Sequence, residues 1–468
     1  MSANISSTGD PTPRQMRTVI LSSTLGTAIE WYDFFLYGTM AVLVFPKLFF
    51  PGATQVVGTL LALFTFLIGF IARPFGGALF GHLGDRIGRK STLVATLLLM
   101  GIATFLIGVL PGYNTLGISA ALLLTLLRLC QGLGVGGEWG GSVLLAMEYG
   151  HKRNRGFWAS WPQLGAPLGL ALSTIVVDIV QSSMTGSAFL SWGWRIPFFV
   201  SALLILMGLY IRLRIMETPL FARVKEQKRE ARSPVLDAFK HSTPEILLTA
   251  GSRFIEQAPF YLFATFAVTY GVDKLLLDKT MILNSITVAA VLEVFTIPLF
   301  GYLSDRVGRR LWYLIGCVLM LAFAFPYFLL MNTKSTALVV LAIVLSLAFF
   351  HSWVYGPQAA MIAERFRTRS RYSGASLGYQ LAAPFAGGLA PIIALLLLNG
   401  KGTLAGLGLS KVKISIGSGS WQAVAIYMVV LAVISFVSVI FLKDLTNADI
   451  TEAAEEKASA GVLAPAGD

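Results

Sequence analysis

Two acidic residues lie three positions apart in an otherwise uncharged stretch near the start of the chain. Glu30 and Asp33 occur in GTAIEWYDFFLYG (26–38), and Tyr37 continues the same face of a helix. Carboxylates this close repel each other where water is scarce, so one of them is expected to hold a proton. A carboxyl that can be neutral or charged is what proton coupling requires. The spacing predicts proton coupling by Asp33 and Glu30, with a static ion pair to an arginine as the alternative.

Two arginines are expected at similar depths inside apolar runs. Arg73 stands well before Gly81, and Arg128 lies well inside its own run. At the rise of an α-helix, these offsets place both side chains about 12–15 Å from a helix end. A planar fork of donors suits a carboxylate, so we predict that both arginines bind an anionic substrate group. The alternative is that each merely neutralises a nearby carboxylate such as Glu138.

A second group of ionisable residues falls in the later part of the chain. Arg253 and Glu256 are spaced i, i+3, which allows a salt bridge within one helix. Glu293 is a candidate interhelical partner, and we expect these residues and Glu138 to form a charge network. A role in gating or proton transfer is the alternative for the Arg253–Glu256 pair. Other polar side chains are candidate substrate-binding groups, and the alternative for each is a role in helix packing alone. They are Tyr37, Gln131, Gln163, Trp161, Tyr261, Gln380 and His351.

The composition around these residues is that of a membrane protein. Of 468 residues, 55% are hydrophobic and 13% are charged, and the charged share is about half that of soluble domains. Cys130 and Cys317 have no ligand-like neighbours, and nothing in the sequence indicates a metal, a cofactor or a catalytic set. We therefore expect an all-α membrane protein that is not an enzyme. The apolar runs predict twelve helices near 19–45, 56–80, 91–110, 116–147, 157–180, 190–214, 247–271, 281–303, 311–331, 336–363, 372–398 and 421–442.

One short motif occurs twice. GHLGDRIGRK (81–90) matches GYLSDRVGRR (301–310) in equal register, with Gly81, Asp85, Arg86, Gly88 and Arg89 among the shared positions. A charged, glycine-rich segment cannot lie in hydrocarbon, so each copy is expected to form a tight loop at the same membrane face. The repeat indicates a duplicated chain with two similar halves.

A second repeat supports the duplication. Glu148 is followed seven residues later by Arg155, and Glu364 is followed by Arg371 at the same offset. Because these pairs lie beside the repeated turns, we predict a cytoplasmic gate closed by ion pairs. The aspartates of the two motifs are expected to cap helix N-termini across the seam between the halves. Rigid turns without a gating role are the alternative. The predicted gate residues are Asp85, Arg86, Arg89, Glu148, Arg155, Asp305, Arg306, Arg309, Glu364 and Arg371.

The basic residues indicate an orientation. With a cytoplasmic N-terminus, the segments assigned to the cytoplasm hold 25 of the 36 Lys and Arg residues, and the opposite face holds seven. This asymmetry follows the positive-inside rule, and it gives no basic patch interleaved with aromatics that would suit nucleic acid. The expected organisation is a cytoplasmic N-terminal tail (1–18), a six-helix half (19–214), a cytoplasmic linker (215–246), a second six-helix half (247–443) and a cytoplasmic C-terminal tail (444–468).

Five segments carry a resemblance to a known family. They are GTAIEWYDFFLYG (26–38), ARPFGG (72–77), QGLGVGGEWGGS (131–142), SWGWRIPF (191–198) and RYSGASLGYQ (371–380). Together with the repeated turns, they resemble the metabolite:H⁺ symporters of the major facilitator superfamily, a group that includes shikimate, α-ketoglutarate and proline/betaine permeases. The resemblance implies two six-helix halves that rock around a midplane site. It also implies a part in proton coupling for Arg128.

These expectations combine into a function. We predict a monomeric, multi-pass transporter of a bacterial-type inner membrane, driven by the proton gradient, that takes up a small carboxylate-bearing solute by alternating access. A shikimate-like hydroxy acid, a dicarboxylate and betaine or proline all satisfy the predicted site. The alternatives are a proton-coupled antiporter exporting an amphipathic solute and a non-transporting nutrient sensor of the same fold. The long loop 399–420 is expected on the outer face without a predicted role.

Overall fold

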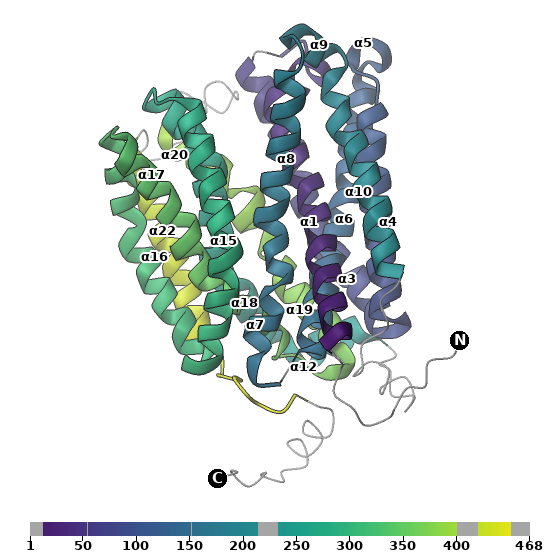
Figure 1. Cartoon of the computed structure of the whole chain (residues 1–468), viewed down its shortest axis with the longest axis vertical. Coiled ribbons are helices and arrows are strands. Elements are labelled where there is room, and N and C mark those ends of the chain that lie inside the picture. The colour runs from purple at the N-terminus through teal and green to yellow at the C-terminus, as the bar shows by residue number, and fades with distance from the viewer. Residues whose placement is uncertain (1–12, 54, 151, 214–232, 400–419, 451–468) are drawn as a thin grey trace.

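The computed structural model describes residues 13–53, 55–150, 152–213, 233–399 and 420–450, which form two groups of helices (Figure 1). In the first group the long runs are α1 (Pro13–Leu43), α3 (Gln55–Ile87), α4 (Arg89–Val109), α6 (Ile118–Tyr149), α7 (Arg155–Ser160) continued by α8 (Gly165–Ser182), and α10 (Ile196–Leu213). The connections hold the short helices α2 (Phe45–Phe49), α5 (Tyr113–Leu116) and α9 (Gly186–Ser191).

The second group repeats this plan with more interrupted helices. Its first run joins α12 (Pro234–Ser252), α13 (Phe254–Tyr261), η4 (Leu262–Phe266), α14 (Ala267–Thr269) and η5 (Tyr270–Lys274). The remaining runs are α15 (Lys279–Val307), α16 (Arg309–Asn332), α17 (Thr336–Val344) with η6 (Leu345–His351) and α18 (Ser352–Ala363), α19 (Arg371–Gln380) with η8 (Ala383–Gly388) and α20 (Ala390–Asn399), and α22 (Trp421–Ile440).

Ten of these twelve runs are long and apolar enough to cross a membrane, within the residues that the structure describes. The other two are α1, which carries Glu30 and Asp33, and the run from α12 to η5, which carries Arg253 and Glu256. All four side chains are buried inside the bundle. These polar side chains lower the mean hydropathy of the two runs. They face the interior of the bundle and not the lipid. The predicted fold class, twelve transmembrane helices in two six-helix halves, is confirmed.

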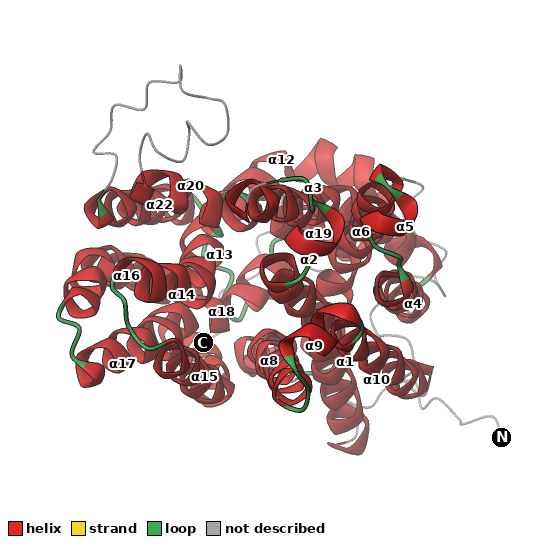
Figure 2. Ribbon diagram, turned by 90° about the horizontal axis from the view of Figure 1, so that it is seen from above, coloured by secondary structure: helices red, strands yellow, loops and turns green. Residues whose placement is uncertain are grey.

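The two groups meet along two lines of contact, seen from above in Figure 2. On one side α19 packs on α3, and on the other α15 packs on α7 and α8. At the centre of the bundle, aromatic rings join the groups: Phe70 lies 5.5 Å from Tyr261 and Phe35 lies 6.0 Å from Phe260 between ring centroids. The seam between the halves is therefore packed by apolar rings at its centre.

The repeated motif forms a tighter turn than predicted. Instead of looping out at residue 81, α3 continues to Ile87 and α15 continues to Val307, and a single glycine separates each from the next helix. Gly88 and Gly308 have φ angles of 122° and 99°, which side chains with a Cβ rarely adopt. The predicted helix ends near 80 and 303 were wrong because the charged motif residues find partners without leaving the helix.

Several other predicted boundaries shift. Helix α1 begins at Pro13, inside the predicted N-terminal tail, and α12 begins at Pro234, inside the predicted linker. Ser242 has non-helical angles (φ −139°, ψ 25°), so residues 234–241 form a separate helical segment before the membrane run. Linker residues 215–232 and most of the 399–420 loop lie outside the described residues. At the other end of the chain, residues 443–450 pack against the bundle.

The second group contains four π-helical segments, η4, η5, η6 and η8. A π-turn leaves backbone carbonyls without their usual helical partners, and such turns are common at functional sites. The segment η6 ends at His351, a buried residue between two carboxylates. These interruptions place the irregular backbone of the second group beside its buried charges.

Replacing Gly308 with alanine should destabilise the protein, because a Cβ at φ 99° is strained. The expected cost is about 1–3 kcal/mol, seen as a lower Tm of the detergent-purified protein. Gly52→Ala is the control, since nothing lies within 4 Å of a Cβ there and its φ is not positive. Equal Tm values for the two variants would contradict the strained-turn interpretation.

Candidate functional site

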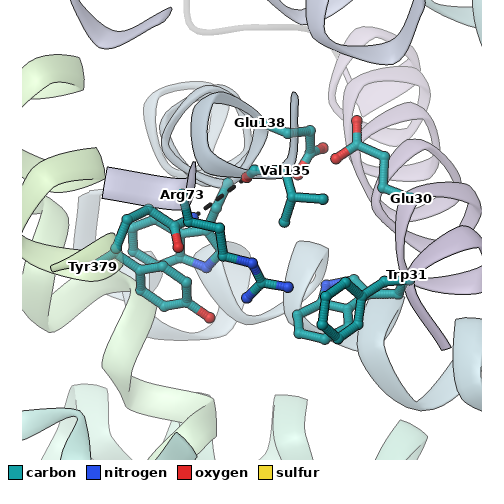
Figure 3. A pocket seen from close by; sticks show the side chains of 9 residues that line it. Glu30, Trp31, Arg73, Val135, Glu138 and Tyr379 are labelled. Atoms are coloured by element: carbon teal, nitrogen blue, oxygen red, sulfur yellow. Dashed lines mark hydrogen bonds between the residues drawn. The ribbon is translucent and has the colours of Figure 1, made fainter. Parts of the chain in front are cut away.

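A small cavity lies between the halves at the level of the predicted charged residues (Figure 3). The volume of the cavity that the centre of a water molecule can occupy is about 10 Å³. This is close to the minimum volume that holds one water. A cavity of this size has no room for an organic solute. We call it the central cavity; it is lined by Glu30, Trp31, Phe34, Arg73, Val135, Glu138, Trp139, Tyr379 and Gln380.

Arg73 is the cation of the central cavity. Its guanidinium carbon lies 4.3 Å from the ring centroid of Phe34, 4.4 Å from that of Phe70 and 5.6 Å from that of Trp31. The side chain is buried, and its Nε and Nη2 have no hydrogen-bond partner among the described residues. An arginine that is stacked on rings but keeps free donors can bind an anionic oxygen from a ligand.

Arg128, one helix away, has a similar environment. It lies over the rings of Tyr37 and Phe34 at 4.2 and 4.5 Å, and its Nε and Nη2 also lack partners among the described residues. Its Nη1 donates to Gln131 Oε1 at 3.0 Å. In the described part of the chain, no carboxylate forms an ion pair with Arg73 or Arg128. The alternative in which these arginines merely neutralise a carboxylate therefore has no contact to support it.

Asp33 connects to Arg128 through a chain of hydrogen bonds. Thr104 Oγ1 donates to Asp33 Oδ2 at 2.9 Å, and Gln131 Nε2 donates to Thr104 Oγ1 at 2.7 Å. Gln131 in turn accepts from Arg128. The chain spans α1, α4 and α6, and all four side chains are buried. The carboxylate of Asp33 is thus connected to the guanidinium of Arg128 through the side chains of Thr104 and Gln131.

Glu30 takes different partners from Asp33. Arg212 Nη2 lies 2.8 Å from Glu138 Oε1 and 3.4 Å from Glu30 Oε1, so one guanidinium serves two carboxylates. Figure 3 shows the two glutamates pointing toward each other on one side of the central cavity, with Arg73 across from them. Arg212 lies in the last turn of α10, and from the sequence it was counted only among the basic residues of the cytoplasmic face. It is the charged residue beside the cavity that sequence reasoning missed, together with the lining residues Trp31, Phe34, Val135, Trp139 and Tyr379.

The buried charges of the second half form one chain. Arg253 Nη2 lies 2.9 Å from Glu256 Oε2, and His351 lies between the two glutamates of the group. Its Nε2 is 3.8 Å from Glu256 Oε1 and its Nδ1 is 2.6 Å from Glu293 Oε1. The predicted salt bridge is present, and Glu293 joins it through the histidine. His351 therefore lies in the charge network and not in the lining of the central cavity, where the sequence had placed it.

The other predicted binding residues bridge the seam or support the arginines. Gln163 accepts from Trp139 Nε1 and donates to the Tyr355 carbonyl, both at 2.9 Å, and Gln380 donates to the Val135 carbonyl at 3.3 Å. Both amides thus connect one half to the other. Tyr37 contacts Thr65 at 2.6 Å, Tyr261 lies beside Phe70, and the half-buried Trp161 packs on Phe157. Of these residues, Gln380 alone lines the central cavity.

The end of the bundle that holds Gly88 and Gly308, here called the turn face, is closed by a symmetric pair of caps. The carboxylate of Asp85 accepts from the backbone N–H groups of Tyr372 and Ser373, at 3.2 and 2.8 Å. Asp305 accepts from Gly156 and Phe157, at 2.8 and 2.9 Å. Each aspartate of one half therefore caps the first turn of a helix in the other half, where the helix dipole favours negative charge.

Ion pairs surround these caps with the same symmetry. Within the halves, Arg89 pairs with Glu148, and Arg309 lies 2.6 Å from Asp305 and 3.2 Å from Glu364. Across the seam, the contacts are longer: Arg155 to Glu364 at 3.5 Å and Arg371 to Glu148 at 3.7 Å. Burial raises the pKa of Glu364, an effect that Arg309 and Arg155 oppose.

Two predicted gate residues do not take part in these contacts. Arg86 and Arg306 are exposed, and Arg306 donates to Tyr302 of its own helix. Successive positions on a helix point about 100° apart, so Arg86 and Arg306 face away from the inward-pointing Asp85 and Asp305 that precede them. The structure thus removes these two arginines from the predicted gate.

Comparison with known proteins identifies the family. The model of the Major Facilitator Superfamily matches residues 23–391 and 286–465. The chain belongs to this superfamily. It is 38% identical over 434 residues to the shikimate transporter of Escherichia coli (strain K12), covering 92% of this chain and 95% of the relative. It is also 41% identical over 384 residues to the inner membrane metabolite transport protein YhjE of the same organism, covering 80% and 86%.

More distant matches agree. The proline/betaine transporter of Escherichia coli (strain K12) is 34% identical over 442 residues, covering 92% of this chain and 84% of the relative. A structure of the proton:xylose symporter XylE superposes with a TM-score of 0.74, covering 95% of this chain and 99% of that one. At 16% identity, this likeness shows the fold alone. The superfamily member described here is a multi-pass metabolite transporter, and its relatives are transporters rather than enzymes.

Removing the charge of both caps, by Asp85→Asn with Asp305→Asn, should open the turn face. Each charge-assisted hydrogen bond is worth about 1.5–3 kcal/mol, so the closed population should fall by tenfold or more. Distances between spin labels at the exposed positions of Arg86 and Arg306 measure this opening. Asp273→Asn, at an exposed aspartate, is the control. Unchanged distance distributions in the double variant would mean that the caps do not hold the turn face shut.

Proposed function

We propose that this transporter is a proton-coupled symporter that takes up a small carboxylate-bearing organic solute. One observation carries the proposal: the unpartnered donors of Arg73 share the central cavity with the carboxylate of Glu30. A buried guanidinium without a counter-ion is costly, and a solute carboxylate supplies the missing charge. The cavity therefore favours an anionic group beside Arg73.

The proposed cycle couples this binding to protonation. A proton on the α1 acids, Glu30 or Asp33, removes negative charge from one side of the site while the solute carboxylate balances Arg73 on the other. Arg128, linked to Asp33 by hydrogen bonds, senses that protonation. With both ligands bound, little net charge remains buried, so the halves can close around the cavity. An empty, charged cavity resists that movement.

The relatives support this class of solute. Shikimate, proline and betaine, named for the relatives, all carry a carboxylate. A proton:xylose symporter shares the fold. We propose a shikimate-like hydroxy acid, a dicarboxylate or a proline/betaine zwitterion as the solute.

The orientation and setting are part of the same proposal. The excess of Lys and Arg on the loops of the turn face favours a cytoplasmic location for that face. We place both termini and the linker between the halves on the cytoplasmic side of a bacterial-type inner membrane. Because the central cavity is lined within one chain, we propose a monomeric functional unit.

Uptake into proteoliposomes tests the proposal. With labelled shikimate, proline and glycine betaine as probes, at least one solute should accumulate when the outside is acid by one pH unit. One coupled proton stores ~1.36 kcal/mol per pH unit, which sustains about tenfold accumulation. Asp33→Asn should lose this accumulation but keep exchange of labelled for unlabelled solute, with Asp273→Asn as control. Accumulation that persists with a proton ionophore present would refute proton coupling.

A further inference from the structure

The glutamates beside the central cavity are not equivalent. Glu138 Oε1 receives three donors: Arg212 Nη2 at 2.8 Å, Thr27 Oγ1 at 3.0 Å and the hydroxyl of Ser142. Glu30 Oε1 has only the 3.4 Å ion contact to Arg212 and no hydrogen-bond partner among the described residues. Glu30 is nevertheless 3% exposed, so its oxygen has little solvent to replace them. The two carboxylates thus differ sharply in how well they are held.

Arg212 creates this difference by its position. Its Nη1 donates to the Leu93 carbonyl, and its Nη2 faces Glu138 more closely than Glu30. One guanidinium balances one carboxylate, so the group of Arg212, Glu138 and Glu30 carries an excess negative charge whenever both glutamates are ionised. In a buried site that excess is relieved by binding a proton. The proton goes to the oxygen with the fewest donors.

We propose that Arg212 is the positioning residue that fixes Glu138 as a permanent anion and leaves Glu30 as the cavity's proton-binding carboxyl. The assignment deepens the proposed symport and rests on it. It gives the two α1 acids separate tasks: Glu30 binds the proton beside the solute, and Asp33 reports charge to Arg128 through Thr104 and Gln131. The charged and titratable groups that line the cavity or neighbour Glu30 are Asp33, Arg73, Glu138, Arg212 and Tyr379.

Infrared difference spectroscopy of the whole protein in liposomes, titrated with pH and without solute, tests the assignment. A carboxyl C=O band that titrates in the unmodified protein should be absent from Glu30→Gln. Arg212→Gln should show a second protonated carboxyl, because two buried glutamates then lack a counter-ion. Glu138→Gln with Arg212→Gln should return to a single band, since the neutral pair restores the charge balance. Asp273→Asn should leave the spectrum unchanged.

Two outcomes overturn the assignment. A band retained in Glu30→Gln places the proton elsewhere, and an Arg212→Gln spectrum identical to that of the unmodified protein removes the positioning role. Melting temperatures of each variant identify a folding failure, and the double variant keeps the test decisive if Arg212→Gln does not fold. Because no transport is measured, a failure here differs from ionophore-insensitive accumulation, which would refute the symport itself.

A separate observation concerns the segment after the last helix. Residues 443–450 run beneath the turn face (yellow in Figure 1) and contact both halves. Arg155 of the first half donates to the Ala448 carbonyl at 2.7 Å, and Arg371 of the second half donates to the Ile450 carbonyl at 2.8 Å. Ile450 is buried in an apolar cluster drawn from both halves, with Met147 and Tyr372 among its members.

These contacts involve the two arginines of the cross-seam ion pairs. Only two residues separate the carbonyls of Ala448 and Ile450, so an extended chain spans about 7 Å between them. When the halves part at the turn face, Arg155 and Arg371 move away from each other, and so short a segment cannot stay bonded to both. We propose that residues 443–450 are a strap that holds the turn face closed and must release one half before it opens.

Ile450→Ser tests the strap, because it removes the apolar side chain from the cluster without adding a charge beside Arg155 and Arg371. Spin labels at Arg86 and Arg306 should then report a several-fold larger open population, with faster solute exchange in proteoliposomes. Ile450→Val, which keeps an apolar side chain, should behave like the unmodified protein. Distances unchanged in Ile450→Ser would show that the strap does not restrain the turn face, and a melting temperature confirms that the variant is folded.

Discussion

A charge buried at membrane depth must find a counter-charge, and this constraint shapes both halves of the protein. In the second half, each buried charged residue contacts the next one in a linear series, Arg253–Glu256–His351–Glu293. In the first half, the buried charges are not fully paired. Arg212 serves two glutamates, while Arg73 and Arg128 rest on aromatic rings with donors unfilled. In the proposed function, these incompletely paired charges of the first half are the ones that a proton and a solute carboxylate neutralise.

The sequence revealed the deep charges but not their partners. Glu30, Asp33, Arg73 and Arg128 are conspicuous because each interrupts an apolar run, and the rise of a helix gives their depth. Partners depend on helix rotation and on contacts between distant segments, which spacing does not determine. Arg212 illustrates this: next to a basic linker it looks like a surface residue, yet its side chain reaches back beside Glu138. His351 likewise joins two glutamates that are distant in the sequence.

The turn face was more predictable because duplication repeats each contact. Once the two motifs align, Asp85 and Asp305 must occupy equivalent positions, and a cap proposed for one applies to the other. The structure places both carboxylates on backbone N–H groups of the opposite half. Two finer details of the predicted turn face were wrong. Arg86 and Arg306 belong to the motif but point away from the seam, and the helices run on to a single glycine rather than ending at a loop.

The lengths of the gate contacts explain how such a face can open at all. Ion pairs within a half are short, as between Arg309 and Asp305 at 2.6 Å, whereas the ion pairs across the seam reach 3.5 and 3.7 Å. A buried ion pair roughly repays the cost of removing its charges from water, so a loose one adds little net stability. When the face opens, water replaces those partners at small cost. These ion pairs therefore contribute less to the closed turn face than the caps, in which Asp85 and Asp305 accept backbone N–H groups across the seam at 2.8–3.2 Å.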